Sequence, residues 1–425
     1  MEQLTQPASK FRSWLPNLKR EIWILAAGQL FLFIGQGFTL VYASIFFVNE
    51  LGFSPTQVGL ALSSSGLAGM VGRFFAGNAI DSRLGRRGTL LLAAVISASA
   101  CFCLAFAETF VLLIVGNLLL GLGLSLYWPA TLAVTADLST ADNRAEAFAL
   151  TQLSNNLGLG LGALLAGQYI AMAGSYRALF ITKGLIYLVF GMVIFSAIAE
   201  TRQTHTTLIR LAKNWLRTLT DRRFVTFLMA NTFFATYGAQ LSSSLPLYLA
   251  NFAPSGDTQM GFSEQLISYL FFWHALLKIV CQLPITRWAK RVNHVSILLV
   301  ALILWAGGFL FIWITGVVPV NALAPALAGF SLVGLAEILY GPAASSLVGD
   351  MAPSDQRGIY FSLESECWAI GFLIGPALGG WALDHPVSGG ANLWLALVSS
   401  TGLAGAILIY LRQQMLAITP FNTQA

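Results

Sequence analysis

Long apolar runs separated by short polar segments dominate the pattern of this chain. Each run is close to the roughly 20 residues that a helix needs to cross the hydrocarbon core of a bilayer. Backbone groups in lipid must be paired within their own segment, and no alternating strand pattern is present, so we expect helices. The runs predict twelve transmembrane helices, which begin near Ile22, Gln57, Thr89, Phe110, Ala147, Ala178, Phe224, Leu266, Ser296, Asn321, Tyr360 and Leu393.

Composition agrees with a membrane protein, because only 10% of the 425 residues are charged and 56% are hydrophobic. A soluble domain carries about 25% charged residues, so lipid must surround much of this surface. Of the 23 lysines and arginines, 19 fall in segments that an even helix count places on the side of both termini. The positive-inside rule therefore predicts cytoplasmic termini, in a multi-pass protein of the plasma (inner) membrane.

The sequence repeats at a spacing of 213 residues, without a gap over nearly fifty positions. Identical residues at this spacing include Tyr127 and Tyr340, Pro129 and Pro342, Asp137 and Asp350, and Arg144 and Arg357. Apolar composition explains chance matches of leucine and alanine, but not these. We expect an all-α protein of two parallel-repeat six-helix bundles around a central cavity, an arrangement found in secondary transporters. The predicted units are residues 1–199, a basic cytoplasmic linker at 200–223, and residues 224–425.

A compact motif follows the second predicted helix, with Gly77, Asp81, Gly85, Arg86 and Arg87. It resembles the loop signature of the major facilitator superfamily, with one additional residue between the aspartate and the second glycine. The resemblance implies that the aspartate faces the start of the eleventh helix and gates conformational change, consistent with a carboxylate near a helix N-terminus. The alternative is that the arginines only anchor the topology.

The eleventh predicted helix carries a glycine-rich motif that consists of Gly371, Gly375, Pro376, Gly379 and Gly380. Glycines four residues apart form a groove for a neighbouring helix, and proline bends the segment. The motif is similar to that of the twelve-helix drug/proton antiporter branch of the superfamily. In the fourth helix, Asn117 stands where the superfamily has an arginine that the resemblance ties to proton coupling.

Ionisable residues inside a membrane are costly and are candidates for function. Glu337 lies near the middle of the tenth predicted helix, and Lys278 and His274 lie one turn apart in the eighth. We expect Glu337 to handle substrate or protons, in competition with Lys278. Two alternatives remain, namely that Lys278 forms a structural ion pair with Glu337 or with Glu364, and that Glu366 pairs with a basic loop residue.

Further candidates for substrate contact are uncharged polar or aromatic residues within the predicted helices. Resemblance to the superfamily implies that helices one, four, seven and ten line the cavity. An aromatic side chain such as Trp128 could stack on an apolar or cyclic ligand. The other candidates are Gln29, Gln36, Tyr127, Gln152, Asn155, Asn231, Gln240 and Tyr340.

These features predict a secondary active transporter rather than an enzyme, since phosphate-binding loops, metalloprotease motifs and serine elbows are absent from the sequence. We expect alternating access, with a small-molecule substrate and protons as partners, no cofactor or metal, no nucleic acid, and a monomer in the bilayer. Export of amphipathic or lipophilic compounds is the leading interpretation. Transport of a specific polar metabolite, such as a sugar or an organic anion, and a transport-inactive sensor are the alternatives.

Overall fold

The computed structural model describes residues 18–81, 84–140, 143–200, 218–254, 261–289, 292–318, 321–353, 356–385 and 392–416. Within these ranges the chain is helical and has no β-strand. The predicted start of every transmembrane helix lies within four residues of an observed one. Most of the predicted linker, residues 201–217, lies outside the described part of the chain.

The first half of the chain forms six long helices, the first of which is extended by a π-helical turn. They are α2 (Arg20–Ile45) with η1 (Phe46–Glu50), α3 (Pro55–Asp81), α4 (Gly85–Ala105), α5 (Phe110–Leu138), α6 (Arg144–Ala173) and α7 (Tyr176–Ala197). The second half contains α9 (Arg222–Ser242), α10 (Ser244–Asn251), α11 (Glu264–Ala289), α12 (His294–Val317), α13 (Leu323–Met351), α14 (Arg357–Asp384) and α15 (Asn392–Leu416).

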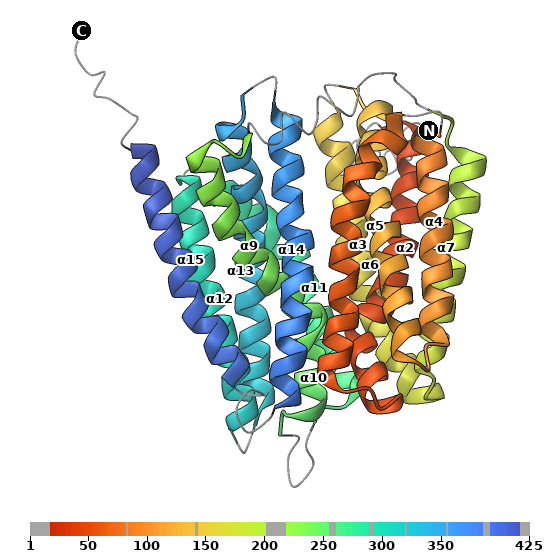
Figure 1. The fold of residues 1–425 in the computed structure, drawn as a ribbon, viewed down its shortest axis with the longest axis vertical. Helices are drawn as coiled ribbons and strands as arrows, with labels where there is room; N and C mark the ends of the chain where they lie inside the picture. Colours follow the sequence, from red (N-terminus) through yellow and green to blue (C-terminus); the bar gives the residue numbers. More distant parts are fainter. Residues whose placement is uncertain are drawn as a thin grey trace, which may run out of the picture.

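Ten helices in the described ranges are long and apolar enough to cross a membrane. The long helices α3 and α9, of 27 and 21 residues, run alongside them (Figure 1). The predicted seventh helix is interrupted, because α9 ends at Ser242 and α10 begins at Ser244. Pro246 explains the break, since it has no N–H to donate to the Ser242 carbonyl four residues earlier.

The helix boundaries reproduce the internal repeat. The starts and ends of α5 and α13, and the starts of α6 and α14, are each 213 residues apart. Each of α5 and α13 contains a proline at the equivalent position, Pro129 and Pro342. At the last turn of α5, Asp137 pairs with Arg86 at the start of α4, while Asp350 on α13 lies 3.5 Å from His294 at the start of α12. The two halves therefore repeat their contacts as well as their sequence.

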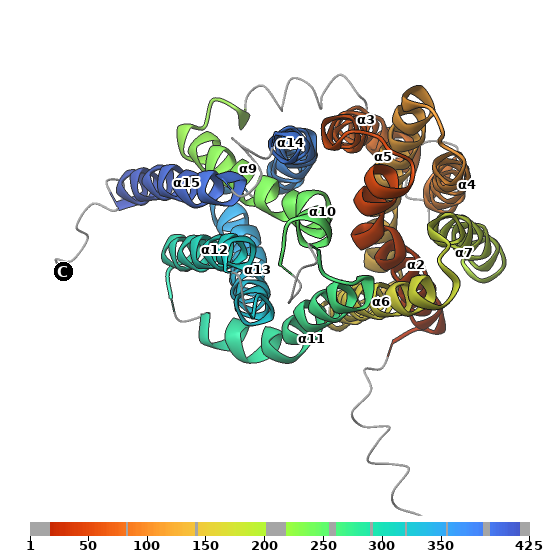
Figure 2. The ribbon, with the colours of Figure 1, turned by 90° about the horizontal axis from the view of Figure 1, so that it is seen from below.

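The two sets of helices form bundles that lie side by side (Figure 1). Seen along the helices in Figure 2, the bundles meet along two seams, where α3 packs against α14 and α6 against α11. We call the end at which α2 begins and α15 ends the terminal end, and the other the far end. The seams leave the space between the bundles bounded on both sides.

Glycine allows close approach within the second bundle, as the motif on α14 predicts. A Cβ atom on Gly371 would lie 2.5 Å from the Ala235 carbonyl carbon, and one on Gly375 would lie 2.9 Å from Ala239 Cβ. Both neighbours belong to α9. Larger residues on this face of α14 would force the two helices apart.

Candidate functional site

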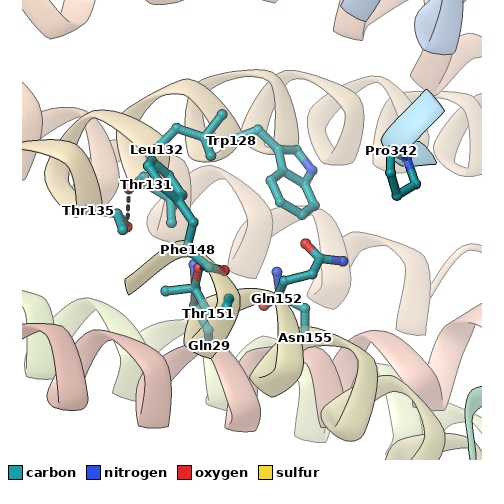
Figure 3. A pocket seen from close by; sticks show the side chains of 11 residues that line it. Gln29, Trp128, Thr131, Leu132, Thr135, Phe148, Thr151, Gln152, Asn155 and Pro342 are labelled. Carbon is teal, nitrogen blue, oxygen red and sulfur yellow. Dashed lines mark hydrogen bonds between the residues drawn. The ribbon is translucent and has the colours of Figure 1, made fainter. Parts of the chain in front are cut away.

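A cavity of about 610 Å³ lies between α2, α5 and α6 of the first bundle and α13 of the second. Figure 3 shows Trp128 on α5 facing Gln152 and Asn155 on α6, with Pro342 of α13 across from them. The lining consists of Gln29, Trp128, Thr131, Leu132, Thr135, Phe148, Ala149, Thr151, Gln152, Asn155 and Pro342. These positions place the cavity in the half of the molecule near the terminal end.

The helical repeat places residues of α5 that line the cavity on one face of this helix. Trp128, Thr131 and Thr135 are three and four residues apart, so they share one face of the helix. The Thr135 hydroxyl donates to the Thr131 carbonyl oxygen at 2.9 Å, which satisfies it within the helix. The Trp128 ring is held edge-on by Phe33 and Tyr127, with ring centroids 5.8 and 5.6 Å away. The indole is therefore fixed in place while 36% of the residue stays exposed.

A cluster of ionisable groups links α11 to α13 at mid-helix. Lys278 Nζ donates to Glu337 Oε2 at 2.7 Å, and His274 Nε2 lies 3.0 Å from the same oxygen. The side chains of all three are largely buried, with about a fifth or less exposed. The pairing that the sequence left open is thus between Lys278 and Glu337. Carboxylate, ammonium and imidazole together can hold and exchange a proton.

The other ring nitrogen of His274 also faces an acceptor, since Nδ1 lies 3.3 Å from the Phe330 carbonyl oxygen. A neutral imidazole can donate from one nitrogen only, whereas the protonated ring donates from both. Each ring nitrogen of His274 thus lies within hydrogen-bond distance of an oxygen, one on Glu337 and one on the α13 backbone.

The cluster is specific to the second bundle. In the repeat, Leu124 on α5 occupies the position that Glu337 occupies on α13. Packing at this position thus requires no charge, because an apolar residue fills it in the first bundle. Burying a charged group costs free energy unless it is paired, so the charges in the second bundle call for an explanation beyond folding.

Helix α11 connects this cluster to the cavity. Ala275, between His274 and Lys278, packs against Gly160 of α6. A Cβ atom on Gly160 would lie only 2.7 Å from Ala275 Cβ. Helix α6 carries Asn155 into the cavity less than two turns away. A displacement of α11 is therefore expected to move the part of α6 that lines the cavity.

The two glutamates on α14 take different partners. Glu366 lies 3.9 Å from Arg73 Nη1 on α3, and the same nitrogen donates to the Ser365 carbonyl oxygen at 3.1 Å. The partner of Glu366 is thus a residue within a helix of the other bundle, not the basic loop residue considered from sequence. Glu364 lies near Asn231 on α9. The contact between Arg73 and Glu366 therefore adds opposite charges to the α3–α14 seam, whereas Glu364 faces α9 within its own bundle.

Several predicted substrate residues lie outside the cavity lining. Tyr340 stacks on Phe234 and donates to Asn231 Oδ1 at 2.8 Å, so it is part of the packed interior. Gln240 is fully buried and donates to the Gly375 carbonyl oxygen at 2.9 Å. Gln36 is half-buried on α2, one helical turn from Thr39. Of the polar candidates, the structure places Gln29, Gln152 and Asn155 at the cavity.

The predicted gating motif is described only in part. Helix α3 ends at Asp81, but the side-chain surroundings of Asp81 and of Gly77 lie outside the described part of the chain. Gly85 has φ +71°, and the backbone N–H groups of Arg86 and Arg87 donate to the Glu200 carboxylate at 2.9 and 3.1 Å. Arg86 also pairs with Asp137 on α5. These contacts fix the start of α4 within the first bundle.

Hydrogen bonds between the bundles gather at the far end. The amides of Asn49 and Asn251 exchange two hydrogen bonds of 3.0 Å. Thr56 donates to Asp384 Oδ2 at 2.6 Å, and the Tyr42 hydroxyl donates to the Glu264 carbonyl oxygen at 2.7 Å. The bundles are therefore joined at the far end, beyond the cavity.

Sequence reasoning missed the threonines of the cavity. Thr131 and Thr135 follow Trp128 on one helical face, and Thr151 precedes Asn155 by four residues on α6. This spacing was a usable signal, since a run of hydroxyl and amide residues on one face is unusual where a helix meets lipid. The role of Arg73 left no local signal, because its hydrogen-bond partner Ser365 lies 292 residues away in the sequence.

Known proteins resemble this chain over most of its length. "Multidrug resistance protein MdtH" of Salmonella paratyphi B is 24% identical over 373 residues, which covers 84% of this chain and 87% of that protein. The protein of the same name from Yersinia enterocolitica is 25% identical over 361 residues, covering 83% and 84%.

Solved structures share the fold. The nucleoside transporter NupG has a TM-score of 0.77 at 12% identity, covering 92% of this chain and 99% of that one. The D-xylose-proton symporter has a TM-score of 0.70 at 16% identity, covering 91% and 96%. The sequence profile of the Major Facilitator Superfamily matches this chain twice, over residues 25–261 and 250–416. With its repeated bundles and the cavity between them, this chain belongs to the Major Facilitator Superfamily of transporters.

Proposed function

We propose that this protein is a proton-coupled secondary exporter of amphipathic or lipophilic compounds. Its substrate binds in the cavity between α2, α5, α6 and α13, and Glu337 exchanges the coupling proton. The relatives named multidrug resistance protein support the substrate class. The mixed lining supports it too, because Trp128, Leu132 and Phe148 offer apolar contacts beside the amides of Gln152 and Asn155.

The observation that carries this proposal is the bond between Lys278 and Glu337 at mid-helix, 2.7 Å long. A carboxylate that binds an ammonium cannot also hold a proton at the same oxygen. Protonation of Glu337 therefore releases Lys278, and loss of the proton recaptures it. The superfamily's arginine is not needed for this exchange. This suits a chain with Asn117 on α5, where the side chain donates to the Leu113 carbonyl oxygen of its own helix.

Release of Lys278 changes what holds α11 against α13. Because Ala275 on α11 packs against Gly160 on α6, the change passes to the helix that carries Gln152 and Asn155. Proton occupancy and substrate occupancy are then coupled through α6 and α11. Such coupling needs two conformations that differ in affinity for both ligands.

The predicted topology supports export as the direction of transport. In our proposal the terminal end faces the cytoplasm, as the distribution of basic residues predicts. The hydrogen bonds of Asn49 with Asn251, and of Thr56 with Asp384, then close the outer side. The cavity lies on the inner side of this seal, where a compound from the cytoplasm or the inner leaflet can reach it. In alternating access, the outer side then opens while the inner side closes.

A specific polar solute is the second candidate, favoured by one observation. Gln29, Gln152, Asn155 and three threonines line the cavity, which is a larger polar share than an apolar ligand needs. Transport by the purified protein in sealed vesicles, with and without a proton gradient, tests the proposal. Uptake of lipophilic dyes that rises with the gradient supports export, whereas gradient-independent behaviour, or response only to a sugar or an organic anion, contradicts it.

A further inference from the structure

Three side chains at the cavity carry buried oxygen atoms that have no hydrogen-bond partner among the described residues. They are Gln29 Oε1, Thr131 Oγ1 and Asn155 Oδ1. Each residue is at least nine-tenths buried, with 1%, 2% and 5% exposed, and each lines the cavity. Buried polar atoms are nearly always paired in native proteins. Two unpaired carbonyl oxygens and one unpaired hydroxyl, which can also accept, lie on the wall of one cavity and therefore point to a ligand that supplies hydrogen-bond donors.

Tyr127 does not meet this need. Its hydroxyl lies near Gln29 and Thr131, but it makes no hydrogen bond of acceptable geometry to either. One hydroxyl has a single proton and could serve only one of the acceptors. Asn155, on α6, lies outside this group of neighbours on α2 and α5.

The lining also carries no charge. None of the eleven residues that the structure places around the cavity is lysine, arginine, histidine, aspartate or glutamate. A charged ligand would lose its hydration without gaining a counter-charge from these residues. The cavity thus favours an uncharged ligand over an anion or a cation.

Trp128 adds a requirement of shape. The indole is exposed to the cavity while Phe33 and Tyr127 hold it edge-on, so its orientation is fixed. A planar ring can stack on an indole held in this way. Gln152, Asn155 and Thr151 lie below the indole in Figure 3, on the opposite wall.

We propose that this cavity selects uncharged planar aromatic compounds that carry N–H or O–H donors. The ring stacks on Trp128, and the donors bind the carbonyl oxygens of Gln29 and Asn155 and the hydroxyl of Thr131. This inference deepens the proposed export function and rests on the cavity being its substrate site. It narrows a general lipophilic class to compounds with a defined hydrogen-bond polarity.

A matched pair of dyes tests the selection. Acridone is planar, neutral and fluorescent and has one N–H donor, and xanthone has the same shape with an oxygen in place of that N–H. Titration of the full-length protein in lipid nanodiscs with acridone, followed by displacement with xanthone, gives both affinities. We expect xanthone to bind about two- to tenfold more weakly, the value of one neutral hydrogen bond. Acridone carboxylate should bind at least about tenfold more weakly than acridone.

Variants test which residues cause the preference for acridone over xanthone. The triple variant Gln29→Met, Thr131→Val and Asn155→Leu replaces all three oxygens with apolar groups of similar size, and it should bind the two dyes equally. Its thermal unfolding midpoint should stay close to that of the wild-type protein, which shows that the variant is still folded. Trp128→Ala should weaken both dyes by a similar factor of about ten while keeping the preference for acridone.

Several results would overturn the proposal: equal affinities of the wild-type protein for acridone and xanthone, preference for the carboxylate, binding of neither dye, or a preference that survives in the triple variant. The titration needs no proton gradient. A failure of gradient-driven transport would thus refute the proposed coupling while leaving the binding result to stand or fall separately.

Discussion

Lys278 Nζ lies 2.7 Å from Glu337 Oε2, in the middle of two helices that a membrane surrounds. The repeat-equivalent of Glu337 is Leu124, so the fold does not require a charge at this depth. His274 contacts the same carboxylate oxygen, and Ala275 beside it contacts the other bundle. One carboxylate therefore lies where an ammonium, an imidazole and the seam between the bundles meet.

Lys278→Met should destabilise the protein, because it leaves the Glu337 carboxylate buried with only His274 as partner. Breaking a fully buried pair costs about 3–5 kcal/mol. We expect a smaller loss of about 1–3 kcal/mol, since the two side chains are 21% and 17% exposed. Thermal unfolding in detergent measures it. The double variant Lys278→Met with Glu337→Gln should recover most of the loss, and a double variant less stable than Lys278→Met would count against a shared pair.

Tyr42→Phe should favour the conformation that opens the far end, because it removes the hydrogen bond to the Glu264 carbonyl across the bundles. One neutral hydrogen bond is worth about 0.5–1.5 kcal/mol, which corresponds to a shift of about two- to tenfold. Ser44→Cys, buried on α2 near this seal, can report it in a variant without native cysteines. Labelling by an impermeant maleimide from outside should then be faster.

Tyr237→Phe is the matched control for this seal. It also removes a hydroxyl contact, 2.9 Å from Ser400 Oγ, but both residues belong to the second bundle. Its labelling rate should equal that of the parent. Similar acceleration in both variants would mean that general loosening, rather than the seal, controls access.

Gly160→Ala should slow transport several-fold, because its Cβ would lie 2.7 Å from Ala275 Cβ and keep α6 from approaching α11. Adding Ala275→Gly should restore the rate by removing the second atom of the clash. Gly402→Ala on α15 is the control, since a Cβ there meets nothing within 4 Å. Rates are compared in vesicles at equal protein density. Unchanged transport by Gly160→Ala would show that this contact does not limit the cycle.

Much of the fold could be predicted, because lipid imposes a simple rule on the sequence. Every helix needs an apolar run of fixed length, and the duplication shows that the two halves share one plan. The break at Ser243 was missed because the apolar run continues across it. Pro246 was the usable signal, since proline cannot donate the backbone hydrogen bond that would continue the helix.

The site could be predicted only in part. The depth of a residue in the membrane follows from its position along the predicted helix, and this placed Glu337 and Lys278 at the same depth. Which faces meet depends on helix rotation and tilt, which the sequence does not encode locally. For that reason Trp128 lines the cavity, whereas Tyr340, chosen on the same grounds, is packed against Phe234.

The most direct test of the account is transport by Glu337→Gln in sealed vesicles with an imposed proton gradient. Glutamine keeps the size of the side chain but cannot exchange a proton, so gradient-driven accumulation of substrate should be abolished. Exchange of labelled for unlabelled substrate at equal pH should remain measurable, because that exchange needs the cavity and not the proton. A Glu337→Gln protein that still accumulates substrate against its gradient in response to protons would contradict the assignment of Glu337 as the coupling site.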